Sequence, residues 1–288
     1  MRYIHSLIMF SLVLLPQLLL AGGGWPQPKH GGYFKLAEWW IISDQHYTDS
    51  GHIDPNVTTG IFNTTLYAEY GFTNRFTGIL NIPLFSRTYH NNLISGTTGE
   101  VLAPGSALNS VGDADLGLKY GLIVNKPVVL SATLFLGLPL GEDNGGIAGS
   151  LQTGDGEFNQ MLQLDLGTSF RLGKLNAYAN LYGGFNNRSN GYSDELRFGI
   201  EGGATFGKDR ITAIARLFGV KSLKNGDPDK AANSTSIFAN NSEFLSFSPE
   251  VAYRLTDRWG VSAGIGTAFS GRIIFANPSY TVGVFVQL

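Results

Sequence analysis

The sequence predicts an all-β chain that forms a closed antiparallel transmembrane β-barrel of about twelve strands. The first observation is the alternation of polar and apolar residues at 113–124, which read DADLGLKYGLIV. Side chains of a strand point alternately to its two faces, so Leu116 and Leu118 share one face, and Asp115 and Lys119 share the other. A barrel in lipid needs such a strand, apolar outside and polar inside.

Similar alternation, bounded by Gly, Pro, Asn and Asp, recurs along nearly the whole chain. The expected strands span residues 32–43, 59–72, 75–87, 113–124, 127–139, 158–172, 175–185, 194–206, 211–222, 243–255, 259–269 and 278–288. Most reach or exceed the roughly 9 to 11 residues that a tilted membrane strand needs.

The connections between these segments give the second observation. Residues 73–74, 125–126, 173–174, 207–210 and 256–258 read as tight turns, and longer polar loops follow the first strand and every second strand after it. Outer-membrane barrels keep short turns on the periplasmic side and long loops outside. We therefore expect short and long connections to alternate strictly.

Folding the hairpins around these turns predicts their registers, with matching polarity on each face. The expected cross-strand pairs are Ala68–Leu80, Leu66–Ile82, Leu166–Leu181, Phe170–Ala177, Glu201–Arg216 and Thr205–Thr212. The last two pairs face inward, so we expect an ion pair between Glu201 and Arg216 in the lumen.

Aromatic residues near the short turns are expected to face outward and form an interfacial belt. They are Phe72, Phe76, Phe170, Phe206, Tyr253 and Trp259. The last strand places Tyr280, Val282 and Val284 on one face and ends at Leu288, where terminal strands of bacterial outer-membrane barrels typically carry an aromatic residue. We expect this strand to engage the assembly machinery and to meet the first strand, because an open sheet edge in lipid is costly.

The N-terminal segment predicts export. Residues 7–20 are mostly apolar and are followed by small residues, as in a signal peptide ending near Gly23. An uncleaved anchor is the alternative, but Pro16 and Gln17 interrupt the run. The expected organisation is a signal peptide at 1–23, a periplasmic leader at 24–31 and the barrel at 32–288. The leader either caps or plugs the periplasmic mouth or is an extended linker.

Composition excludes several classes of site. The chain has no cysteine, which excludes disulfides and thiolate sites. Its net charge of −2 shows no excess of positive charge of the kind that nucleic-acid binding requires. One predicted loop carries Asp44, His46, Asp49, His52 and Asp54, but their spacing presets no metal geometry, so we expect no metal and no cofactor. No predicted strand places an outward Ser beside an outward His, so we expect no catalytic site and no enzyme.

The polar faces of the predicted strands supply the candidate lumen. Its lining residues are expected to be Glu69, Asp113, Asp115, Lys119, Asp165, Arg171, Tyr178, Tyr182, Glu201, Arg216, Glu250 and Arg254. Both signs of charge occur, whereas a strongly ion-selective filter uses rings of one sign. Two interpretations stay open: a cross-linked wall that any polar lumen requires, and a path for a small solute.

Three segments together resemble the outer-membrane barrel family named for the meta-pathway of phenol degradation. They are residues 111–120 (VGDADLGLKY), 136–141 (LGLPLG) and 153–155 (TGD), in the middle third of the chain. In that family a proline directly precedes the TGD loop, whereas an insert separates Pro139 from Thr153 here. The resemblance implies a barrel suspected of moving small, often hydrophobic, compounds across the outer membrane, and it implies no catalytic residues.

We therefore expect a bacterial outer-membrane barrel that acts as a passive pore or uptake channel for small solutes, including hydrophobic ones. Its expected partners are outer-membrane lipid, the solute and the assembly machinery, and not nucleic acid. The alternatives are a non-conducting structural or surface-interaction barrel and an outer-membrane lipid-modifying enzyme.

Overall fold

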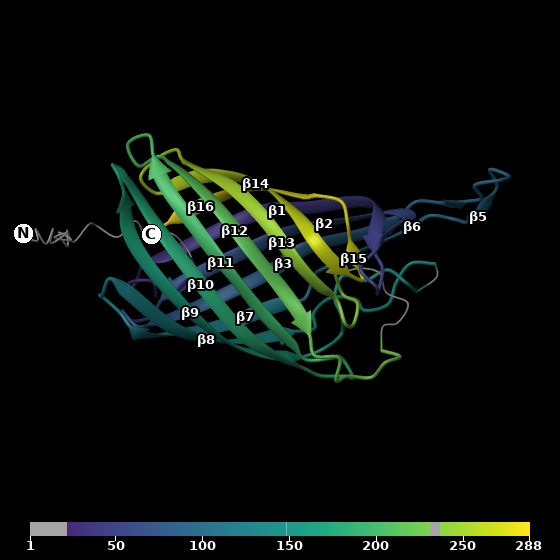
Figure 1. The fold of residues 1–288 in the computed structure, drawn as a ribbon, viewed down its shortest axis with the longest axis horizontal. Coiled ribbons are helices and arrows are strands. Elements are labelled where there is room, and N and C mark those ends of the chain that lie inside the picture. Colours follow the sequence, from purple (N-terminus) through teal and green to yellow (C-terminus); the bar gives the residue numbers. More distant parts are fainter. Residues whose placement is uncertain (1–21, 148, 231–236) are drawn as a thin grey trace, which may run out of the picture.

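A computed structural model describes residues 22–147, 149–230 and 237–288. Twelve antiparallel strands form a closed barrel (Figure 1). In order around the barrel they are β1 (Gly32–Tyr47), β2 (Ile53–Gly71), β3 (Phe76–His90), β7 (Ala114–Ile123), β8 (Val128–Leu138), β9 (Asn159–Leu172), β10 (Leu175–Arg188), β11 (Glu195–Phe206), β12 (Ile211–Ser222), β13 (Glu243–Arg254), β14 (Trp259–Arg272) and β16 (Ser279–Gln287). In the described part of the chain, no helix has the length and apolar character to cross a membrane.

The first and last barrel strands pair with each other, as predicted. β1 and β16 are joined in an antiparallel register that includes Leu36 with Val284 and Glu38 with Val282. Pairing of these two strands leaves no open edge, which in lipid would expose a row of unpaired backbone groups. The predicted all-β barrel is therefore confirmed.

All six predicted cross-strand pairs occur in the sheet. Leu66 pairs with Ile82 across β2 and β3, Leu166 with Leu181 across β9 and β10, and Glu201 with Arg216 across β11 and β12. Because side chains alternate between faces, a register error of one residue would turn a whole strand inside out. These registers therefore place the apolar residues of these hairpins on the outer face.

Exposure follows the predicted faces. On β7 the side chains of Leu116 and Leu118 are 43% and 50% exposed, whereas Lys119 between Leu118 and Tyr120 is 2% exposed. The six aromatic residues predicted for the interfacial belt are all exposed. One acidic side chain, Glu38, shares the outward face with Leu36, and its Oε2 accepts a hydrogen bond from Thr64 Oγ1 at 2.6 Å.

Shorter and longer connections alternate as predicted, with two to four residues at one end and five or more at the other, but some of the expected long loops are only slightly longer than the turns. β1 and β2 pair as far as Tyr47 with Ile53, which leaves five residues between them, and six residues join β10 to β11. The strands continue past the apolar band because their polar ends keep pairing in water. Asp44, His46 and Asp54 consequently lie in strands, so the five acidic and histidine residues do not form one loop. The described residues contain no group of three that could hold a metal.

Three long connections remain, and all lie at the end opposite the C-terminus (Figure 1). Residues 91–113 carry the small hairpin of β4 (Leu93–Ile94) and β5 (Val101–Ala103), and then β6 (Ser106–Ser110), which extends the pairing of β3. Residues 139–158 connect β8 to β9, and residues 223–242 connect β12 to β13. A short strand, β15 (Ile274–Phe275), pairs with the end of β1.

Candidate functional site: the barrel lumen

The leader before β1 lies inside the barrel. Gly24 N donates to Asn180 Oδ1 at 2.9 Å, and Gln27 N donates to Thr77 Oγ1 at 2.8 Å, both in buried positions. Gln27 Nε2 also donates to Glu69 Oε2 at 2.9 Å, and the Gln27 side chain is 2% exposed. These contacts reach β2, β3 and β10, so the leader crosses the lumen.

The rings of the leader fit over glycines of the wall. A Cβ at Gly167 of β9 would lie 2.7 Å from the Trp25 ring, and one at Gly121 of β7 would lie 2.6 Å from Pro26. Trp25 also meets Tyr178 edge to face, with ring centroids 6.2 Å apart. Glycine at these two positions therefore permits an approach that any larger residue would block.

Charged residues lie buried beneath the leader. Lys119 Nζ donates to the carbonyl oxygen of Gly23 at 2.9 Å and lies 3.8 Å from Glu69 Oε1. The hydroxyl of Tyr67 donates to the same Glu69 carboxylate. Buried charges need partners, so the leader supplies polar groups that complete this part of the wall.

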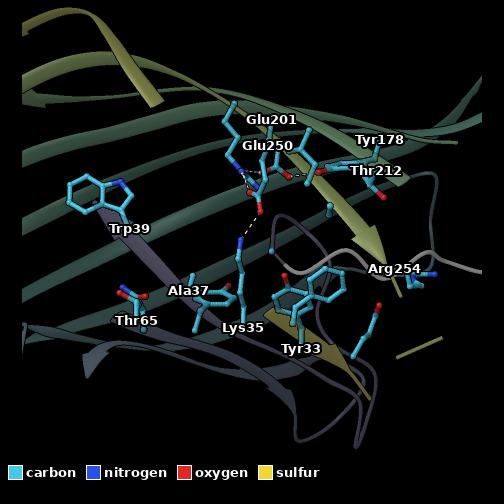
Figure 2. A pocket seen from close by; sticks show the side chains of 18 of the residues that line it. Tyr33, Lys35, Ala37, Trp39, Thr65, Tyr178, Glu201, Thr212, Glu250 and Arg254 are labelled. Carbon is cyan, nitrogen blue, oxygen red and sulfur yellow. Dashed lines mark hydrogen bonds and ion pairs between the residues drawn. The ribbon is translucent and has the colours of Figure 1, made fainter. Parts of the chain in front are cut away.

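A second charged network crosses the opposite wall (Figure 2). Glu250 accepts from Lys35 Nζ and from Arg216 Nη1, each at 2.6 Å, and Arg216 Nε also pairs with Glu201. Tyr178 OH donates to Glu201 Oε1 at 2.7 Å. The predicted ion pair between Glu201 and Arg216 is confirmed, and it belongs to a network that joins β1, β10, β11, β12 and β13.

A cavity of about 470 Å³ lies against this second network, and Tyr178, which contacts Trp25 of the leader, forms part of its wall. Its aromatic lining comes from Tyr33, Trp39, Tyr67, Tyr178 and Phe285. Figure 2 shows Lys35 pointing from β1 toward Glu250, with Tyr33 and Arg254 farther along the same space. The cavity thus combines flat apolar surfaces with the paired charges of this network, and Arg210 and Arg254 also line it.

Four other candidate lining residues lie in separate places along the wall. Asp165 lies buried, with both carboxylate oxygens accepting from Gln163 Nε2. Tyr182 covers Gly199 of the neighbouring strand, where a Cβ would lie 2.6 Å from its ring. Asp115 accepts from Asn81 Nδ2 at 3.4 Å, and Arg171 is exposed near the periplasmic turn.

A second buried cluster lies toward the long loops and was not predicted. Arg188, at the end of β10, pairs with Asp155 at 2.9 Å, with Glu195 at 2.8 Å, and with Glu157. Its guanidinium carbon also lies 4.3 Å from the centre of the Tyr192 ring. Arg188 therefore links the loop between β8 and β9 to β10 and β11.

Asp113 holds the same loop at both ends. Its carboxylate accepts from Gly141 N at 2.9 Å and from Asp155 N at 2.8 Å. Burial raises the pKa of the Asp113 carboxyl to about 6, although both hydrogen bonds oppose this shift. Within the loop, Thr153 and Glu157 are each 1% exposed, so the loop is folded inward over the lumen.

Comparison with known proteins identifies the fold. No protein-family model and no curated protein matches the chain. Among solved structures, an outer membrane channel from Pseudomonas putida F1 is 15% identical with a TM-score of 0.57, covering 94% of this chain and 100% of that one. The β domain of the Bordetella autotransporter BrkA is 14% identical with a TM-score of 0.51, covering 90% and 100%. The KdgM porin, solved with disordered oligogalacturonate, is 11% identical with a TM-score of 0.45, covering 90% and 99%.

At these identities the likeness concerns the fold. The chain has the closed antiparallel barrel of bacterial outer-membrane proteins.

Proposed function

We propose that this chain is a bacterial outer-membrane barrel that provides a passive path for small solutes, narrowed by its own leader. The cavity of about 470 Å³ inside a closed barrel carries this proposal. None of the leader residues 24–31 lines this cavity, so the leader does not fill this part of the lumen. Ligand sites in barrels of this kind combine apolar walls with a few polar groups.

The paired charges on the Glu250 side of the cavity argue against a strongly ion-selective filter. Glu250 sits between Lys35 and Arg216, so the charges on this stretch of wall largely offset one another. The aromatic lining supports passage of solutes with an apolar or planar part. The resemblance of residues 111–120 to the phenol meta-pathway barrel family supports the same solute class.

A non-conducting structural barrel is the second candidate. The buried hydrogen bonds of Gly24 and Gln27, together with the inward loop held by Asp113, favour it because they close part of the lumen. In this case the extracellular loops would carry the activity. We propose no catalytic activity for either barrel.

Planar-bilayer recording of the purified mature protein tests the two candidates. A variant that lacks residues 25–28 should conduct more than the full protein, because these residues occupy the lumen beside the cavity. Trp25→Phe, which keeps the length of the leader and an aromatic ring, is the matched control and should conduct like the full protein. Persistent silence of all three proteins would contradict a pore and support the structural barrel.

A further inference from the structure

Two arginines lie side by side where the cavity meets the periplasmic turns. Arg210 ends the turn between β11 and β12, and Arg254 ends β13 directly across from it. Arg254 N donates to the carbonyl oxygen of Arg210 at 2.8 Å, and both residues line the cavity. The sheet therefore presents two guanidinium-bearing residues to one space.

Neither arginine has a carboxylate partner in the described part of the chain. Arg216 pairs with two carboxylates and Arg188 with three, whereas no Asp or Glu oxygen there lies within 4.0 Å of Arg210 or Arg254. Asp209, next to Arg210 in the chain, accepts instead from Asn176. Figure 2 shows Arg254 without an interaction to the other residues drawn.

Like charges directly opposite each other destabilise a sheet. Deeper in the described lumen, Lys35, Lys119, Arg188 and Arg216 each pair with an acid. An unpaired cation pair at a cavity wall is instead suited to an anion that comes from outside. Arginine is the side chain best shaped for this, because its planar fork binds a carboxylate through two parallel hydrogen bonds.

The aromatic residues beside the two arginines indicate what the uncharged part of the ligand is. Tyr33, Tyr178 and Phe285 line the same cavity, so a planar apolar body has surfaces to pack on beside the arginines. Glu201 and Glu250 are both engaged by Arg216, which leaves the free positive charge at the periplasmic end.

We infer that Arg210 and Arg254 form a binding site for the anionic group of a small aromatic carboxylate, whose ring packs on the aromatic wall of the cavity. The inference deepens the proposed function by naming a solute class for the path. Binding itself does not require that the barrel conducts.

Calorimetric titration of the detergent-solubilised mature protein with benzoate tests the site. Benzoate should bind, and benzyl alcohol and inorganic phosphate, which lack either the charge or the ring, should bind at least about tenfold more weakly. The double variant Arg210→Gln and Arg254→Gln should lose benzoate affinity by about tenfold or more. Arg258→Gln, at the next periplasmic turn and outside the cavity lining, is the matched control and should bind like the unchanged protein.

Benzoate binding that survives in the double variant would overturn the inference, as would an equal loss in the Arg258 control. Equal binding of phosphate or benzyl alcohol would overturn the assigned ligand class. Bilayer recording tests conduction by the barrel separately from benzoate binding. A barrel that does not conduct but binds benzoate through the two arginines contradicts the solute path and supports the binding site. A barrel that conducts but does not bind benzoate supports the path and contradicts the site.

Discussion

Arg188 shows how much of the extracellular end depends on one side chain. Its side chain is 5% exposed and pairs with three carboxylates, two from the loop between β8 and β9 and one from β11. The sequence contains each of these residues, but no local pattern indicates that they meet, because the loop that carries Asp155 and Glu157 must first fold inward. This cluster could therefore not be predicted, whereas the ion pair of Glu201 and Arg216 followed from one hairpin register.

Replacement of Arg188 by alanine should lower the free energy of unfolding by about 3 to 5 kcal/mol, because it leaves buried carboxylates without a counter-charge. Arg197→Ala is the matched control. Arg197 pairs with the same Glu195, but its side chain is 39% exposed, so its loss should cost about 1 kcal/mol or less. Urea unfolding in lipid vesicles measures both, and equal effects would contradict the assigned role of Arg188.

Asp113 should make the inward loop sensitive to pH. Burial raises the pKa of its carboxyl from 3.8 to about 6, so the folded loop holds the proton more tightly than the unfolded chain does. This stabilisation is fully present below pH 3.8 and is lost as the pH rises through about 6. Amide hydrogen exchange across residues 139–158, corrected for intrinsic rates, should show less protection at pH 7.5 than at pH 5.

Asp113→Asn should remove this dependence, because the amide does not titrate. A variant whose protection still changed between the two pH values would show that another group carries the effect.

At the scale of the element, the sequence predicts where the strands of this barrel lie, but it does not predict where they end. Period-two alternation and tight turns predict the paired faces, as at Leu166 and Leu181. The polar ends of β1 and β2 look like loop in composition, since both of their faces meet water, yet their backbones continue to pair. The leader has no periodicity, and its partners lie far away in sequence, as Gly24 and Asn180 do.

The outward face of β8 gives a direct test of which elements meet lipid. Leu134, in the middle of the strand, is 48% exposed, and Leu134→Arg should destabilise the folded barrel in vesicles by about 2 to 4 kcal/mol. Leu255→Arg, in the turn after β13, should cost about 0 to 1 kcal/mol, because the cost falls near the interface. Similar penalties at the two positions, measured by urea unfolding, would contradict the assigned depth of β8.

For the whole molecule, closure of the sheet separates two environments. The pairing of β1 with β16 leaves apolar side chains outside and encloses the leader, the paired charges and the cavity. The sequence predicted the barrel and the polarity of its faces because both follow from alternation. It did not predict how the lumen is divided, because that depends on contacts between segments with no shared pattern.

The central claim is that one side of each strand faces lipid while the other faces an aqueous interior. Neighbouring residues of β1 test it most directly, since Leu36 is exposed outside and Ala37 lines the cavity. The chain has no cysteine, so a single nitroxide can be attached at Leu36→Cys or Ala37→Cys in vesicles and its collisions measured by electron paramagnetic resonance. The account predicts that oxygen relaxes the label at position 36 and a water-soluble nickel chelate relaxes the label at position 37. Equal access of the nickel chelate to both labels would contradict it.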